Sequence, residues 1–268
     1  MRFIFALLLF LLFSCPSYSQ FLVDGFRQPK QSAIIGLSTG VNSWDSFYSA
    51  KGEVGLQKKT WITNTYLSLN PIQSLRIAAN IPYLSVIDKD VNSFQDLFVH
   101  AQWMPIQLAG FSPFLLFGYG EPLNTYQTEI GNAIGQQATL RAYGFGIQYT
   151  LGNWFGALAY QHQDKNQPVP DANQWQIRGG YFKGKWFAAL RMDHQTSVGG
   201  SNYRDGSNRP FTTLGADFTN LSVDLYRRVF KNLGFSATIG KNLGGNNVGN
   251  SMEYFFGIIL NGQIKQRP

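Results

Sequence analysis

Apolar and polar side chains alternate with a period of two in many short segments from residue 31 onward. In segment 186–193, one set of alternate positions holds Trp, Ala, Leu and Met, and the other holds Phe, Ala, Arg and Asp. Segments 96–103, 143–151 and 221–226 alternate in the same way. Successive side chains of a β-strand point to opposite faces, whereas a helix repeats every 3.6 residues. The pattern therefore predicts an all-β protein.

Turn-forming residues separate the alternating segments, as at Gly152-Asn153 and Lys183-Gly184-Lys185. Short links of this kind are typical of β-hairpins. We expect twelve strands, over residues 31–41, 60–70, 75–87, 94–104, 111–123, 138–151, 154–163, 174–182, 186–196, 221–230, 233–242 and 251–262. The short links alternate with longer polar links, which are 42–60, 88–93, 124–137, 164–173, 197–220 and 243–250. Residues 211–218 fit either an additional strand or part of a long loop.

This arrangement is typical of a transmembrane β-barrel, which has an even number of antiparallel strands and alternates short turns with longer loops. A barrel in lipid must close, because an open sheet edge would leave backbone N–H and C=O groups unpaired. The predicted fold is thus a closed antiparallel transmembrane β-barrel of about twelve strands, occupying residues 31–268. A soluble secreted β-sandwich or barrel would also alternate, but water would then favour charged side chains on its outward face.

The composition agrees with a barrel in lipid. Of the 268 residues, 14% are charged and 15% are aromatic, whereas globular domains carry about 25% charged residues. A charge on the lipid face of a barrel costs about 2–4 kcal/mol at the midplane. Disordered chains are poor in aromatic residues. A membrane helix needs about 20 consecutive apolar residues, and no such run follows residue 13.

The first nineteen residues have the order of a secretory signal peptide. Arg2 precedes the apolar stretch 3–13, and Ser17 and Ser19 supply the small residues before a cleavage site. Cleavage after Ser19 would leave no cysteine in the mature chain, whereas acylation at Cys15 would instead make a lipoprotein. We expect a leader over 1–19, an N-terminal periplasmic segment over 20–30, and export to the outer membrane.

The net charge of +7 comes from scattered Lys and Arg residues. A nucleic-acid-binding surface would instead show a basic cluster or stripe. The partners expected from the sequence are outer-membrane lipid and a small-molecule solute, with no nucleic acid. The pattern indicates no oligomeric state.

Polar and charged residues on the face opposite the apolar band are candidates for lining the lumen. They are Arg76, Asn80, Asp96, His100, Arg178, Arg191, Asp193, Asp224 and Arg228. Mixed Arg and Asp side chains have two possible roles in a narrow barrel. They can pair across the lumen and plug it, or they can line a water path and set its selectivity.

Catalytic and metal chemistry have weaker support. His100, His162 and His194 lie on separate predicted strands, without the local ligand spacing of a zinc site. His194 and Thr196 share one strand face, which is similar to the His-x-Ser arrangement of outer-membrane phospholipases and lipid A deacylases. Thr196 stands where Ser would be expected, and Ser197 falls on the opposite face. The sequence indicates no catalytic residue, cofactor or metal, and a lipid hydrolase is only a minor alternative.

The chain also resembles a family of outer-membrane barrels labelled the meta-pathway of phenol degradation family, described as transporters. The similarity lies in Leu75-Arg76-Ile77 and Ile81-Pro82-Tyr83, in Phe94-Gln95-Asp96, in the Gly131–Gly135 loop, and in the closing 251–260 strand. The resemblance implies passage of small, hydrophobic or aromatic solutes, and transfers no functional residue. We therefore expect a passive channel or transporter, with a structural or assembly component of an outer-membrane complex as the alternative.

Overall fold

The computed structural model describes residues 30–87, 89–129, 132–203 and 211–263. The expected leader and residues 20–29 lie outside these ranges. The strands are β1 (Ser32–Ser49), β2 (Gly52–Ile72), β3 (Leu75–Val86), β4 (Val91–Phe94), β5 (Asp96–Trp103), β6 (Phe111–Pro122), β7 (Leu140–Leu151), β8 (Trp154–Lys165), β9 (Asp171–Lys183), β10 (Trp186–Val198), β11 (Asp217–Arg228), β12 (Leu233–Asn246), β13 (Val248–Gly249) and β14 (Met252–Gln263). A single turn of 3-10 helix, η1 (Phe211–Thr213), precedes β11. Within the described ranges, no helix is long and apolar enough to cross a membrane.

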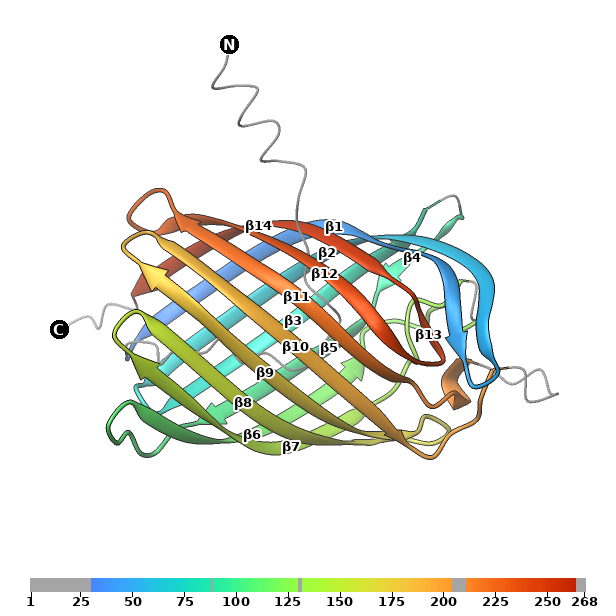
Figure 1. Ribbon diagram of the computed structural model, residues 1–268, viewed down its shortest axis with the longest axis horizontal. Coiled ribbons are helices and arrows are strands. Elements are labelled where there is room, and N and C mark those ends of the chain that lie inside the picture. Colours follow the sequence, from blue (N-terminus) through green and yellow to red (C-terminus); the bar gives the residue numbers. More distant parts are fainter. Residues whose placement is uncertain (1–29, 88, 130–131, 204–210, 264–268) are drawn as a thin grey trace, which may run out of the picture.

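Twelve of these strands close into an antiparallel barrel, in which each pairs with its neighbours along the chain (Figure 1). The short strands β4 and β13 add local pairs to β3 and β1. The ring is closed by β1 and β14, whose register runs from Ser32↔Gln263 to Ser43↔Met252. Closure leaves no unpaired edge along the barrel. The predicted fold class is confirmed.

The two ends of the barrel differ. At one end, which we call the turn end, the links are residues 73–74, 104–110, 152–153, 184–185 and 229–232. The other end, the loop end, carries the long links 123–139 and 199–216. The described chain begins and finishes at the turn end, on β1 and β14. The two longest links thus lie at the loop end, as expected, although the loop-end link 50–51 is shorter than the turn-end link 104–110.

Two predicted long links are wrong, 42–60 and 243–250, and most of the second belongs to β12 and β13. Residues 42–60 belong mostly to β1 and β2, which form a hairpin with a tight turn at residues 50–51. Their polar composition predicted a loop, but this hairpin extends past Val86, where β2 stops pairing with β3. Polar residues such as Asp45 and Lys59 suit the face of this hairpin that meets water, whereas Phe47 and Ser49 are buried. Residues 211–218, which fitted either a strand or a loop, form η1, a link over 214–216 and the first two residues of β11.

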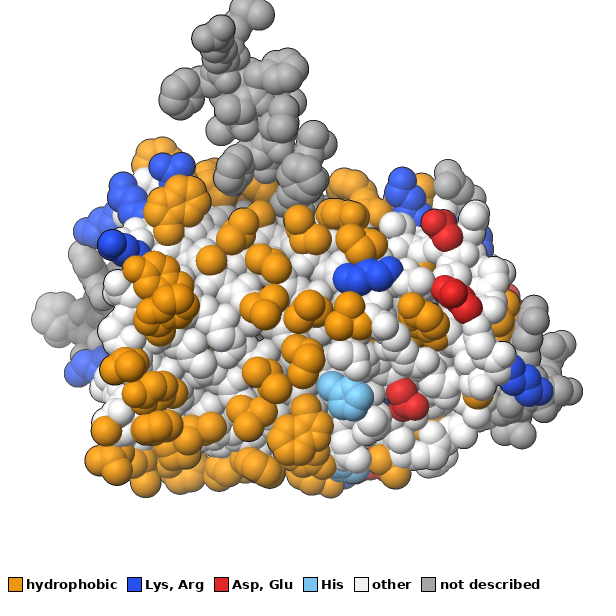
Figure 2. All heavy atoms as spheres, in the orientation of Figure 1, with side chains coloured by type: hydrophobic (Ala, Val, Ile, Leu, Met, Phe, Trp, Pro, Cys, Tyr) orange, Lys and Arg blue, Asp and Glu red, His pale blue; other side chains and the backbone are white. Residues whose placement is uncertain are grey.

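The outer face carries a belt of exposed apolar side chains. Phe117 and Phe145, for example, are each 56% exposed. Figure 2 shows hydrophobic side chains over the middle of this face, with most charged side chains toward its two ends. Aromatic residues flank the belt, with Trp103, Trp154 and Trp186 toward the turn end and Trp61, Tyr143 and Trp175 toward the loop end. An apolar band between aromatic girdles is the outer surface expected of a membrane-spanning barrel.

The inner face accommodates large rings by placing glycine beside them. A Cβ on Gly118 would lie 2.6 Å from Cζ of Phe98, and one on Gly146 would lie 2.3 Å from Cζ of Phe114. Both phenylalanines are only 2% exposed. Glycine in a strand permits this kind of close approach. The rings therefore lie against the neighbouring wall instead of crossing the lumen.

Candidate functional site: the lumen of the barrel

The sequence-derived lumen candidates lie on inward-facing positions of five strands. Arg76 and Asn80 are on β3, Asp96 and His100 on β5, Arg178 on β9, Arg191 and Asp193 on β10, and Asp224 and Arg228 on β11. Arg76 and Asp193 have no exposed surface, whereas Arg228 is exposed. The structure brings four of them into one network and places the others at different heights of the barrel.

The network joins two bases and two acids along one wall. Arg178 Nη2 lies 2.9 Å from Asp224 Oδ2, and Arg191 Nε lies 3.0 Å from Asp193 Oδ2. Arg191 Nη1 is also 3.9 Å from Asp224 Oδ2, and Thr238 donates a hydrogen bond of 2.8 Å to Asp224 Oδ1. All five side chains come from the consecutive strands β9 to β12. The ion pairs therefore run along the wall, unlike a plug that would join opposite walls.

Glutamines extend this network around the barrel. Gln176 Nε2 donates to Asp193 Oδ1 at 2.6 Å. Gln174 Oε1 accepts from Gln161 at 3.0 Å and from Gln163 at 3.3 Å. A buried amide needs such partners, because an unpaired polar group costs about 1–3 kcal/mol. The result is a polar wall from β8 to β12 whose side chains are held by one another.

The wall formed by β3 and β5 to β7 is filled more tightly. Arg76 pairs in register with Gln102 on β5, and both side chains are fully buried. A cluster of buried apolar side chains lies on the adjoining strands; its members are Met104, Phe114, Leu116, Ala157 and Ala159. His100 stacks on Phe98, with ring centroids 5.8 Å apart. This side of the lumen is therefore a packed core at the level of Arg76 and Gln102.

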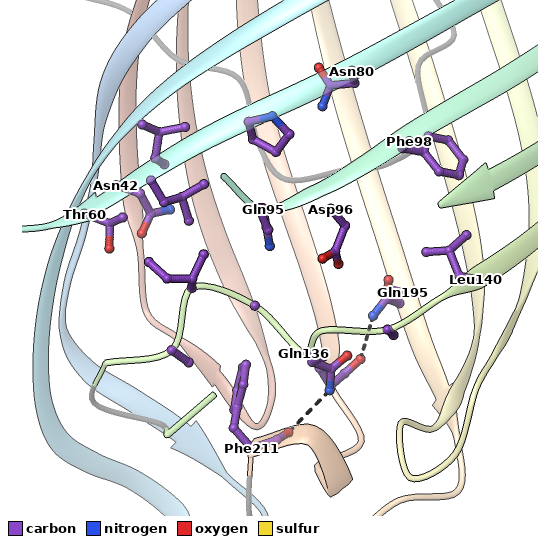
Figure 3. A pocket seen from close by; sticks show the side chains of 18 of the residues that line it. Asn42, Thr60, Asn80, Gln95, Asp96, Phe98, Gln136, Leu140, Gln195 and Phe211 are labelled. Atoms are coloured by element: carbon purple, nitrogen blue, oxygen red, sulfur yellow. Dashed lines mark hydrogen bonds between the residues drawn. The ribbon is translucent and has the colours of Figure 1, made fainter. Parts of the chain in front are cut away.

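A cavity of about 300 Å³ opens toward the loop end, and we call it the loop-end chamber. In Figure 3, Asn80, Asp96 and Phe98 project into it from β3 and β5, and Gln136 reaches from the long loop toward Phe211. Its lining combines apolar side chains with amides and three charged groups, Lys58, Asp96 and Lys165. Mostly apolar walls with a few placed polar groups are typical of small-molecule sites.

The loop between β6 and β7 folds into the barrel and forms one side of this chamber. Ile134 packs with Ile62, Leu84 and Phe255 on the inner face. Lys58 Nζ donates a hydrogen bond to the Ala133 carbonyl. Gln136 Nε2 donates to the Leu214 carbonyl at 3.0 Å, which links this loop to the one before β11. The described part of the loop is therefore anchored by both apolar packing and hydrogen bonds.

Tyr126 is the second anchor of the same loop. Its hydroxyl donates to Asp96 Oδ1 and accepts from the backbone N–H of Gln137 at 2.8 Å. Burial, and then the neighbouring charge of Asp96, raise the pKa of Tyr126 above its ordinary value. The hydroxyl consequently keeps its proton and remains a hydrogen-bond donor. Asp96 is thus tied to the loop that narrows the lumen.

A larger cavity of about 970 Å³ lies toward the turn end, and we call it the turn-end chamber. Arg178, Arg191, Asp224 and Arg228 line it, so it collects four of the sequence-derived candidates. Asn64 lines both chambers. Tyr66 lines the turn-end chamber, and its register partner Asn80 lines the other one. The level of Asn64 and Tyr66 on β2 therefore separates the two chambers.

The residues of the hydrolase alternative lie outside the lumen. His194 and Thr196 occupy outward positions of β10, and the hydroxyl bonded to His194 among the described residues is that of Thr219, at 2.9 Å. Ser197 bonds Asp217 instead. Within the same described ranges, no three His, Cys, Asp or Glu side chains group as metal ligands. His194 therefore bonds the hydroxyl of Thr219 on the neighbouring strand β11 and not that of Thr196, which the sequence had placed beside it.

Three solved structures share the fold. The COG4313 outer membrane channel from Pseudomonas putida F1 superposes with a TM-score of 0.71 at 14% identity, covering 90% of this chain and 99% of that one. The NanC porin gives 0.58 at 9% identity, covering 84% and 98%. The KdgM porin gives 0.54 at 10% identity, also covering 84% and 98%. No protein-family model and no curated protein matches the sequence. The chain has the fold of an outer-membrane channel barrel.

Sequence reasoning did not single out Lys58, Tyr126 or Lys165. Lys58 lies in the region predicted as a long loop, so the sequence did not indicate its inward position on β2. Tyr126 lies in an irregular loop, where alternation does not indicate which way a side chain points. The amide row was detectable, because Gln161 and Gln163 share one face of β8 while Gln174 and Gln176 share one face of β9.

Proposed function

We propose that this protein is an outer-membrane β-barrel that passes small solutes passively. The observation that carries the proposal is the pair of chambers inside a closed barrel, both reaching Asn64, beneath an apolar outer belt. Closure and the belt suit a barrel in lipid. Chambers arranged in series along a barrel suit the passage of solute.

The position of the ion pairs supports a channel over a purely structural barrel. Arg178, Arg191, Asp193 and Asp224 neutralise one another along the wall. A structural or assembly role would be favoured if such pairs crossed and sealed the lumen. Here the same residues border open space, since three of them line the turn-end chamber.

We propose small hydrophobic or aromatic solutes as the class that enters. The loop-end chamber offers Trp44, Phe98, Phe211 and Phe218 together with amides. Aromatic walls bind apolar solutes, and the amides orient their polar groups. The resemblance to the meta-pathway of phenol degradation barrels implies the same class. Among the similar folds, the KdgM porin has been solved in complex with disordered oligogalacturonate.

The proposal includes export and cleavage. We expect residues 1–19 to be removed as a leader, residues 20–30 to lie in the periplasm, and the barrel from residue 31 to span the outer membrane. N-terminal sequencing of the protein from isolated outer membranes should begin at Gln20. Recovery of a chain with an acylated Cys15 would show that the protein is processed as a lipoprotein instead.

Reconstitution tests the channel itself. Purified, folded barrel in planar bilayers should give discrete conductance steps, and in liposomes it should permit swelling with small sugars and phenolic solutes. A preparation of the same protein unfolded by heat serves as the control. Absence of both conductance and swelling from the folded barrel would remove the channel proposal and leave the structural role.

A further inference from the structure

Charge is distributed unevenly between the two ends of the barrel. In the described chain, the turn-end links 73–74, 104–110, 152–153, 184–185 and 229–232 contain no Asp or Glu. They contain Lys185 and Lys231, and Arg228 ends the strand that leads into the last link. All three side chains line the turn-end chamber. This mouth of the lumen is therefore uniformly basic.

The deeper charges of that chamber do not offset the basic mouth. Arg178 and Arg191 are matched by Asp224, which also lines the chamber, and by Asp193 behind them in the wall. Two bases and two acids cancel. The net charge of the turn-end chamber is therefore positive and comes from Lys185, Arg228 and Lys231.

The loop-end chamber carries charges of both signs. Lys58 and Lys165 line it with a single carboxylate, Asp96. Glu253 also faces inward, but it accepts a hydrogen bond of 2.9 Å from Asn42 and lines neither chamber. Asp171 also lies beside Lys165, whose backbone N–H donates to Asp171 Oδ1 at 2.8 Å. The excess of positive charge that a solute meets therefore belongs to the turn-end chamber.

We propose that the lumen selects small anions. This inference rests on the proposed channel function and specifies its solutes. Rings of basic side chains favour anions in a pore, and low-dielectric walls concentrate the field of those charges. The apolar and aromatic part of the loop-end chamber narrows the class to organic anions with a compact apolar body. An aromatic carboxylate has both features.

The decisive measurement is the reversal potential of single channels under a potassium chloride gradient. The test variant is Arg228→Gln with Lys231→Gln. The matched control is Arg227→Gln with Lys183→Gln, which removes the same charge from the same end. Arg227 adjoins Arg228 on β11 but faces outward, where its guanidinium lies 4.5 Å from the centroid of the Trp186 ring. The heat-dependent gel mobility of each variant reports whether the barrel has folded.

For the wild type we expect a chloride-to-potassium permeability ratio of roughly 3 or more, falling at high salt because charges are screened. The test variant should lower this ratio by about twofold or more, and the control should leave it unchanged. Benzoate should reduce the chloride current, whereas benzylammonium, its counterpart of opposite charge, should not.

Each adverse result has a distinct meaning. A wild-type ratio of one or less would overturn anion selection while leaving the channel intact. Equal ratios in the two double variants would show that Arg228 and Lys231 do not set selectivity. Equal effects of benzoate and benzylammonium would reject the organic-anion class. Complete absence of conductance would overturn the proposed channel function, and the proposed anion selectivity with it.

Discussion

Arg178 and Asp224 form an ion pair at 2.9 Å although β10 lies between their strands. Arg191, on that intervening strand, reaches the same carboxylate at 3.9 Å. Asp224 therefore holds two guanidinium groups on the lumen wall. Arg191 also pairs with Asp193 at 3.0 Å, so loss of Asp224 would leave two buried cations with one carboxylate.

Asp224→Asn should lower the free energy of unfolding by about 3 kcal/mol, because it breaks the buried ion pair with Arg178. Urea unfolding in detergent or vesicles measures this value. Adding Arg178→Gln to Asp224→Asn should recover part of the loss, since one uncompensated cation is then removed. A double variant that is less stable by the full sum of the single losses would contradict the shared role of Asp224.

Tyr126→Phe should loosen the loop between β6 and β7. The variant loses the hydroxyl that donates to Asp96 and accepts from Gln137, at a cost of about 1–3 kcal/mol for the buried groups left unpaired. Single-channel records should then show a larger and noisier current. Tyr119→Phe is the matched control, because its hydroxyl bonds Glu121 on the exposed outer face. Identical traces from both variants would disprove the anchoring role.

Asn64→Phe should reduce conductance severalfold by enlarging the side chain where the two chambers meet. Asn64→Ala should raise it for the opposite reason. Thr65→Phe places the same ring on the adjacent outward position of β2 and should leave conductance near the wild-type value. Conductance and folded fraction should be recorded for all three. An unaltered current in Asn64→Phe would show that the narrowest part of the lumen lies elsewhere.

Gly118→Val should displace the ring of Phe98, since even a Cβ would lie 2.6 Å from it. Overpacking of this kind costs about 1–3 kcal/mol, and the displaced ring would enter the loop-end chamber. We expect lower stability together with smaller conductance. Gly156→Val on β8 is the control, because the nearest atom to its Cβ is a backbone oxygen at 3.9 Å. If both variants behave alike, the close packing of Phe98 has no effect on the lumen.

The sequence was informative wherever the alternation of side chains continued without interruption. The pattern at Trp186 to Asp193 predicted β10 and its inward face, and the structure has both. The alternation did not indicate which side chains pair with one another across strands. Pairing of Arg178 with Asp224 depends on the register of three strands, which one sequence does not provide. The inward fold of the loop at Tyr126 depends on contacts with distant strands and was equally inaccessible.

The hairpin of β1 and β2 shows why composition misled the prediction. Ser43, Asp45 and Lys59 are polar, and polar runs between apolar strands usually indicate loops. Beyond the apolar belt the outer face of a strand pair meets water, so polar residues there no longer separate strand from loop. Backbone pairing decided the structure there, as the register Ser43↔Lys59 shows.

Closure by β1 and β14 also constrains how the molecule can fold. The pairing of Ser32 with Gln263 joins positions at opposite ends of the described sequence. Forming contacts between residues so far apart in sequence has a high entropic cost of loop closure, and proteins dominated by such contacts fold slowly. The hairpins can form from local contacts, whereas the sealed ring requires nearly the whole chain. Until that final seam forms, β1 and β14 each present a free edge that other strands could join.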